Sequence, residues 1–428
     1  MKYIKENTSQ DGISQIAIFM ILCMVASFVL FSFFSVYLYG LISLVIAFVL
    51  LFFACCIDME SILLALPSAF FCILSLCMLF VSGRWGERGF WAPIFHAYKY
   101  IYLFLVHTMG IVMRFLTAKQ KKIVVAAAFF SAVCTSLYSS YFVFTIDQNA
   151  MRNAQHFGVA DFNIVYGIML ITIVVFSALL FCKEKAGWNL FLLCCFLSFA
   201  VMIMSSLFTT ALLLFLSGLG ACLLVKIYEK YGTKAVIIMG VLMFFLVFVI
   251  YLFSESISEW LYNNTEDLNS IIRVRVRSVA DKVLNTEHDL GGYNADRRGE
   301  LAGYSLHTFM ANPLFGVGYT GFGYGIIGNH QEWQDMLGVF GIVGSAFLVT
   351  TLITIIYQIY RKNNTKEDRV SFTIALLLFT VLGFLNPCFS PQVLMAVFFI
   401  APNVSIFSSM KEERVYELKE YKYIRNYA

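Results

Sequence analysis

The stretch FNIVYGIMLITIVVFSALLFC, residues 162–182, holds 21 residues and no charged side chain. At a rise of 1.5 Å per residue, a helix of this length spans about 31 Å, which matches the roughly 30 Å of a bilayer's hydrocarbon core. Similar runs recur along a chain that is 60% hydrophobic and only 13% charged. Too little polar surface remains to cover a water-soluble globule. The sequence therefore predicts an all-α, polytopic integral membrane protein.

We expect about twelve transmembrane helices and one long, partly helical extracytoplasmic loop. The predicted spans lie near residues 14–33, 36–57, 61–82, 95–116, 123–145, 162–182, 188–205, 207–228, 233–253, 335–360, 370–387 and 391–409. This divides the chain into residues 1–253 with helices one to nine, the loop 254–334, residues 335–409 with the last three helices, and a cytoplasmic tail 410–428. The first run is long and no cleavage site follows it, so we expect it to stay as a helix.

The distribution of lysine and arginine predicts the orientation. Short loops rich in these residues stay in the cytoplasm. One orientation places 20 of the 30 basic residues on cytoplasmic segments. It puts both termini inside and the loop 254–334 outside.

The placement of the cysteines and the net charge argue against several kinds of site and partner. Ten of the eleven cysteines fall within apolar spans and the long loop has none, so neither a disulfide framework nor a cysteine-ligated metal site is indicated. The net charge of +4 follows from the cytoplasmic basic residues and gives no reason to expect a nucleic-acid partner.

The end of the long loop has recognisable helix signals. Asp296 can cap a helix from Arg297 to about Ala311, which Asn312-Pro313 would end. Asn329 is expected to cap the next helix, with Glu332 at its third position completing a capping box. His330 would then open the helix that returns to the membrane.

The loop also carries groups suited to chemistry on a phosphate-linked substrate. A histidine in the first turn of a helix feels the positive end of the dipole, which keeps a neutral, proton-accepting ring available. Guanidinium groups match diphosphate oxygens with paired donors. Six arginines on outside segments are candidates for this role, namely Arg152, Arg273, Arg275, Arg277, Arg297 and Arg298. The loop nevertheless counts ten acidic residues against six basic ones, so any positive patch is local.

Each feature also has a simpler interpretation. Taken alone, His330 is interpreted more simply as an interfacial polar residue at a helix start, and Arg152 as a solvated loop residue. Arg273, Arg275 and Arg277 alternate as in a strand, although helical sequence follows, and they can bind lipid headgroups or the loop's own carboxylates. The GxGxxG at residues 316–321 lacks a βαβ context, so it does not indicate a nucleotide site. Gly338, Gly341 and Gly344 are spaced for close helix packing.

Arg298, Glu300, Leu301 and Phe309 are followed by the stretch NPLFGVG at 312–318, and then by His330, Trp333 and Gly341-Ile-Val-Gly344. This combination resembles the bacterial O-antigen polymerase and O-antigen ligase superfamily. The resemblance covers about fifty residues directly, and the long outside loop and twelve-helix layout extend it to the whole chain. Two features depart from the family pattern. Gln331 stands where an asparagine is usual, and SSLFTTA at 205–211 lacks the arginine of a common Ser-Arg pair.

The resemblance implies a polysaccharide polymerase in the bacterial inner (plasma) membrane. It implies that His330 and Arg298 are catalytic and that Arg152 helps to bind an undecaprenyl-diphosphate-linked glycan. The reaction expected is an inverting glycosyl transfer that uses no metal and no cofactor, with flippase and chain-length regulator proteins as possible partners. Arg273, Arg275, Arg277 and Arg297 are further candidates for substrate binding.

Three alternatives stay open. A ligase would hand a finished polymer to a terminal acceptor instead of the next repeat unit. A lipid-linked oligosaccharide flippase or solute carrier would need polar groups at mid-membrane, where these spans have few. A scaffold without catalysis would leave the spacing from Arg298 to His330 unexplained.

Overall fold

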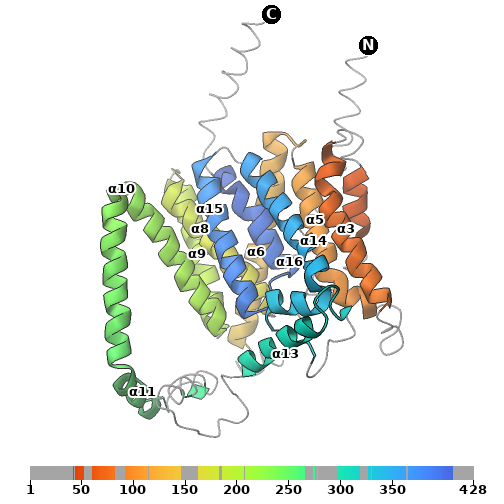
Figure 1. The fold of residues 1–428 in the computed structure, drawn as a ribbon. Helices are drawn as coiled ribbons and strands as arrows, with labels where there is room; N and C mark the ends of the chain where they lie inside the picture. Colours follow the sequence, from red (N-terminus) through yellow and green to blue (C-terminus); the bar gives the residue numbers. More distant parts are fainter. Residues whose placement is uncertain are drawn as a thin grey trace, which may run out of the picture.

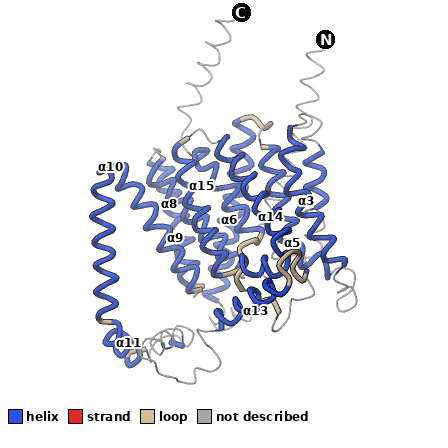
Figure 2. The backbone as a smooth tube through the Cα atoms, viewed as in Figure 1, coloured by secondary structure: helices blue, strands red, loops and turns tan. Residues whose placement is uncertain are grey.

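The structure is a computed structural model that describes residues 42, 44–52, 60–81, 92–113, 115–145, 162–182, 186–206, 208–265, 273–274, 277, 297–318, 326–328, 330–362 and 365–407. These residues form a helical bundle, and no strand occurs among them (Figures 1 and 2). The helices are α3 (Glu60–Val81), α5 (Ala92–Val112), α6 (Ala118–Thr145), α8 (Phe162–Phe181), α9 (Ala186–Ser205), α10 (Thr209–Leu252), α11 (Ser254–Asn263), α13 (Arg297–Ala311), α14 (Glu332–Lys362), α15 (Lys366–Leu385) and α16 (Pro391–Met395). A π-helical turn η3 (Ala396–Ile400) and a 3-10 segment η4 (Ala401–Phe407) continue α16.

Within the described ranges, seven helices are long and apolar enough to cross a membrane. These segments are Glu60–Met78, Lys119–Tyr141, Asn163–Phe181, Ala186–Ser205, Thr209–Leu242, Glu332–Arg361 and Lys366–Leu385. Two shorter apolar helices, Lys99–Val112 and Pro391–Ser405, correspond to the predicted spans 95–116 and 391–409. The chain is therefore a multi-pass membrane protein by length and composition, and the count of twelve stays a prediction.

Helix α10 joins two predicted spans, 207–228 and 233–253. Its backbone breaks at Gly232, where φ is 73° and ψ is −171°, a conformation that glycine adopts far more readily than other residues. The break lies in the gap between the two predicted spans. After it, the helix runs apart from the rest of the bundle down to α11 (Figure 1).

Helix α8 lies at the centre of the bundle, with 78% of its span buried. A Cβ added to Gly167 would lie 2.5 Å from the Cβ of Gln392 in α16, and one added to Gly218 of α10 would lie 2.7 Å from Ile173 Cδ1. These close approaches seat α10 and α16 against α8. Away from this contact, α3, α5 and α14 meet where the rings of Phe71, Tyr100 and Phe340 pack at centroid distances of 5.2–5.3 Å.

The two ends of the bundle differ in chemistry. At one end, Arg361 pairs with Glu60 at 3.7 Å and Lys366 with Glu229 at 2.9 Å, while Lys226 Nζ donates to the Leu180 carbonyl oxygen at 2.6 Å. We call this the basic end; its lysines and arginines belong to segments predicted to be cytoplasmic. Helices α11 and α13, which belong to the predicted outside loop, lie at the opposite end (Figure 1). We call that the loop end.

Candidate active site

Helix α13 is the first element of the loop end that packs on the bundle. It runs from Arg297 to Ala311, the bounds that its cap and the following Asn-Pro predict. The next residues, 312–318, lie along α14 and share backbone hydrogen bonds with it. Val317 N donates to Gly338 O at 3.0 Å, and Ile342 N donates to Pro313 O at 2.8 Å. The NPLFGVG stretch is therefore built into the start of α14.

Two glycines make this close approach possible. Gly316 and Gly341 have φ values of +65° and +61°, and α14 is broken at Gly341. A Cβ on Gly341 would lie 2.5 Å from the Leu314 carbonyl oxygen, and one on Gly316 would overlap the Val339 carbonyl oxygen. The expected close helix packing is present at Gly338, where an added Cβ would lie 3.0 Å from the Ser305 carbonyl oxygen of α13. At Gly341 the close contact is with the stretch 312–318 instead. At Gly344 an added Cβ would meet Phe340 of the same helix.

A polar bridge fastens α13 to the first turn of α14. Ser305 Oγ donates to Asp335 Oδ1 at 2.5 Å and accepts from Gly328 N at 2.9 Å. Asp335 Oδ2 accepts from Gln331 N at 3.1 Å. Ser305 and Asp335 are both buried, so these bonds form where water does not compete. The bridge holds the residues on both sides of His330.

An ion pair lies next to this bridge. Lys99 Nζ of α5 lies 3.4 Å from Glu332 Oε2, and the same oxygen accepts from Cys388 N at 3.0 Å. Glu332 is 3% exposed and Lys99 20% exposed. Burial, with the nearby Glu332 charge, raises the pKa of the Cys388 thiol well above its usual range, so this cysteine is a neutral packing residue. Glu332 thus ties α14 to α5 and to the loop before α16.

The start of α14 differs from the prediction. The helix begins at Glu332, so His330 precedes its first turn, and the predicted capping box with Glu332 at the third helical position is wrong. The Glu332 carboxylate is used instead by Lys99 and Cys388. Glu332 and Asp335 also place two acidic groups in the first turn, which offset the positive end of the helix dipole. The helix dipole therefore gives no reason to expect a neutral His330.

The predicted site residues fall into three groups. His330 lies in the described chain with an exposed side chain. Arg297 and Arg298 open α13, and their side chains lie outside the described residues, as do Arg152 and Arg275 entirely. Arg277 Nε donates to Thr265 Oγ1 at 3.1 Å, and Arg273 is half-buried. Arg273 and Arg277 are helical where the structure describes them, so the strand that their alternation suggested is not observed at these two positions.

The backbone brings the Arg298 and His330 segments together. Gly328 packs so closely on α13 that an added Cβ would overlap the Leu301 carbonyl oxygen. Arg298 lies three residues before Leu301, about one helical turn, and His330 lies two residues after Gly328. The two segments therefore share one region of the loop end.

The sequence did not assign Lys99, Ser305, Glu332 or Asp335 to the site. One signal was present, because an ionisable residue such as Lys99 inside an apolar span marks a functional site by default. Its partner follows 233 residues later, and no local pattern indicates that pairing.

Comparisons of the chain with protein-family models and with curated proteins found no match.

Proposed function

We propose that this protein is a membrane glycosyltransferase that polymerises polysaccharide from undecaprenyl-diphosphate-linked glycans, as its resemblance to the O-antigen polymerase and ligase superfamily implies. The observation that carries the proposal is the contact of Gly328 with Leu301, which joins the segments of Arg298 and His330 at the loop end. The His330 side chain is exposed, and hydrogen bonds hold the backbone on both sides of it. A residue that must contact a large substrate needs both properties. The undecaprenyl chain would stay in the bilayer.

In the reaction proposed, the imidazole of His330 accepts the proton of an acceptor sugar hydroxyl. The oxygen attacks the anomeric carbon of the donor glycan from the face opposite the diphosphate, and the anomeric carbon–oxygen bond breaks. The electron pair leaves with undecaprenyl diphosphate, so the linkage forms with inversion. Arg298, with Arg152 and the remaining loop arginines, would stabilise the charge on the departing diphosphate.

Glu332, Asp335 and Ser305 act in this proposal as positioning residues. Ser305 and Asp335 hold Gly328 and Gln331, the neighbours of His330. Glu332 fixes the following helix to α5 through Lys99. A catalytic base must keep its place within hydrogen-bond reach of the substrate, and a doubly tethered loop provides that.

The test is complementation of a deletion strain, with the glycans separated on a gel. His330→Ala should insert normally and give single repeat units instead of a ladder. His307→Ala is the matched control, because His307 is an exposed histidine on α13. Arg298→Lys should also lose the ladder, because a bare ammonium does not reproduce the paired donors of guanidinium.

Other outcomes would reject this function. A normal ladder from His330→Ala contradicts the role of the histidine. Full-length polymer left on its lipid carrier in the deletion strain indicates a ligase, and precursor that remains facing the cytoplasm indicates a flippase.

A further inference from the structure

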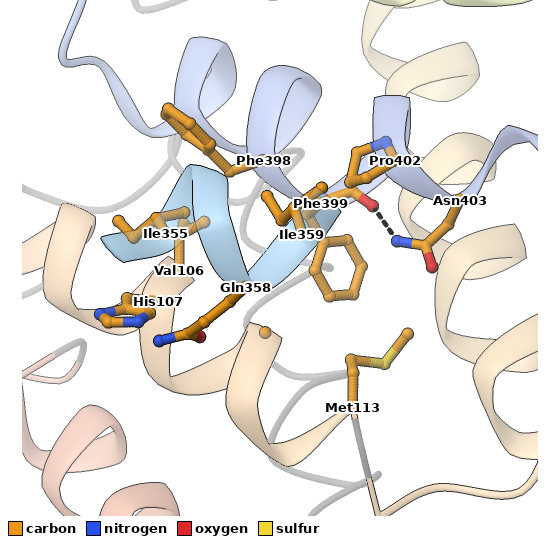
Figure 3. Close-up of a pocket in the computed structure, with 11 residues that line it drawn as sticks. Val106, His107, Met113, Ile355, Gln358, Ile359, Phe398, Phe399, Pro402 and Asn403 are labelled. Carbon is orange, nitrogen blue, oxygen red and sulfur yellow. Dashed lines mark hydrogen bonds between the residues drawn. The ribbon is translucent and has the colours of Figure 1, made fainter. Parts of the chain in front are cut away.

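Two features of the described chain lie apart from the candidate active site. One is a cavity of about 40 Å³ toward the basic end, whose polar lining comes from His107 of α5, Gln358 of α14 and Asn403 (Figure 3). The side chains of His107 and Gln358 share a hydrogen bond, and Asn403 Nδ2 donates to the Phe399 carbonyl oxygen at 2.7 Å. These polar groups have partners within the chain, so the cavity gives no reason to expect a ligand.

The second feature is the outer half of α10, residues 233–252, together with α11. At 1.5 Å per residue this half rises about 30 Å, and its only charged residue is Lys234, next to the break at Gly232. None of its described side chains is buried, and Phe244 and Tyr251 are each 73% exposed. A helix that is apolar on every side belongs in a membrane or a protein core. The described residues build no core around this one, so it is a membrane span that lipid surrounds and that ends at the loop end (Figure 1).

Helix α11 follows directly at Ser254 and has two different faces. Ile257 and Trp260 are three residues apart and share one face, whereas Glu255 and Glu259 are four residues apart and share another. At 100° per residue, the centres of the two faces lie about 150° apart around the helix. Ile257 is 38% exposed and Trp260 63% exposed, and both glutamates are exposed as well. The described chain therefore leaves both faces of α11 uncovered.

The apolar face of α11 continues the surface of the membrane span. Val249 and Phe253, from the last turn of α10, line an open groove of about 400 Å³ together with Ser256, Ile257 and Trp260. Ser256 is the one polar residue of this lining, and neither glutamate belongs to it. Surface that surrounds the end of a membrane span thus passes without interruption onto α11.

We propose that α11 lies in the membrane surface at the loop end, with Ile257 and Trp260 inserted among the lipid chains and Glu255 and Glu259 facing water. A helix with opposed apolar and charged faces lies in the plane of the interface, where tryptophan is enriched. The two carboxylates do not attract anionic headgroups, so burial of the apolar face provides the binding. The groove then holds acyl chains of the adjoining leaflet. Helix α11 fixes the start of the long loop at the membrane surface.

A genetically encoded, environment-sensitive fluorescent amino acid tests this proposal in the full chain in nanodiscs. The probe replaces Ile257 in one variant and Glu259, on the opposite face, in the matched control. Brominated phosphatidylcholine quenches a probe among the lipid chains, and iodide quenches a probe in water. We expect brominated lipid to quench the probe at position 257 severalfold more than the probe at position 259, and iodide to show the reverse order.

Two results would overturn the proposal. Equal iodide quenching at the two positions would place α11 in water. Protection of the probe at position 257 from both quenchers would mean that a protein segment covers the apolar face instead of lipid. If the Ile257 variant does not purify as a monodisperse protein, probes in place of Trp260 and Glu255 form a second pair with the same expected order.

Discussion

Among the side chains at the loop end, Glu332 is the one whose substitution should lower the free energy of unfolding most. Glu332→Gln keeps the shape of the side chain and removes the carboxylate that pairs with Lys99 in a largely buried position. Breaking a buried ion pair from one side costs roughly 3–5 kcal/mol, and the partial exposure of Lys99 lowers this to about 2–3 kcal/mol. We therefore expect a marked loss of thermal stability, measured on the purified protein in nanodiscs.

The double variant provides the control for this prediction. Lys99→Met with Glu332→Gln removes both charges, so it should be less destabilised than the two single variants added together. Additive losses would mean that the two side chains do not interact. Arg361→Met is a matched comparison, because its pair with Glu60 is exposed and should contribute less than about 1 kcal/mol.

At the same scale, the sequence predicts some contacts of the loop end and misses others for a physical reason. The roles of His330 and Arg298 come from the family resemblance and stay predictions, although Gly328 and Leu301 bring their segments together. Glu332 was assigned to a local cap because a carboxylate three residues after an asparagine fits that motif. Its actual partners, Lys99 and Cys388, come from elements far away in the chain, which local patterns do not report.

Among the elements, the junction of the NPLFGVG stretch with α14 depends on Gly341. At φ 61° and ψ −165°, the backbone conformation is essentially restricted to glycine, and a Cβ would also overlap Leu314. Strain and overlap together should cost Gly341→Ala at least about 2 kcal/mol. Thermal unfolding and the length of the glycan ladder should both report the damage.

Gly303→Ala is the control for that variant. Gly303 lies in α13, its side is exposed, and a Cβ there meets nothing within 4 Å. Alanine in an exposed helix is favoured over glycine by roughly 0.5–1 kcal/mol, so this variant should be neutral or slightly stabilised. Equal loss of stability in the two variants would contradict the importance of the junction.

The elements themselves were predictable where the signal is local. The bounds of α13 follow from a cap and a proline, and the break of α10 coincides with the gap between two apolar runs. The break of α14 at Gly341 was not predicted, because the spacing of Gly338, Gly341 and Gly344 equally suits a straight helix packed on another helix. The position of residues 312–318 against α14 decides between a straight helix and one that is broken at Gly341, and the glycine spacing does not indicate that position.

Taken as a whole molecule, the bundle separates its polar groups between two ends. The bridge of Ser305 and Asp335 and the pair of Lys99 and Glu332 lie at the loop end, while the His107 cavity lies toward the basic end. Apolar helices connect them, with α5 carrying both Lys99 and His107. This arrangement suits chemistry at one membrane face.

The orientation of these ends in the membrane is the prediction that the proposed reaction most requires. Positive charge on short loops places the basic end in the cytoplasm. A cysteine introduced at exposed Gly303 should then react with a membrane-impermeant maleimide in intact spheroplasts. A cysteine in place of Lys366, which pairs with Glu229 at the basic end, should react only after the membrane is opened. The unmodified chain sets the background from its native cysteines. The reverse pattern would put His330 in the cytoplasm, where the glycan that a polymerase extends is absent, and would exclude the proposed function.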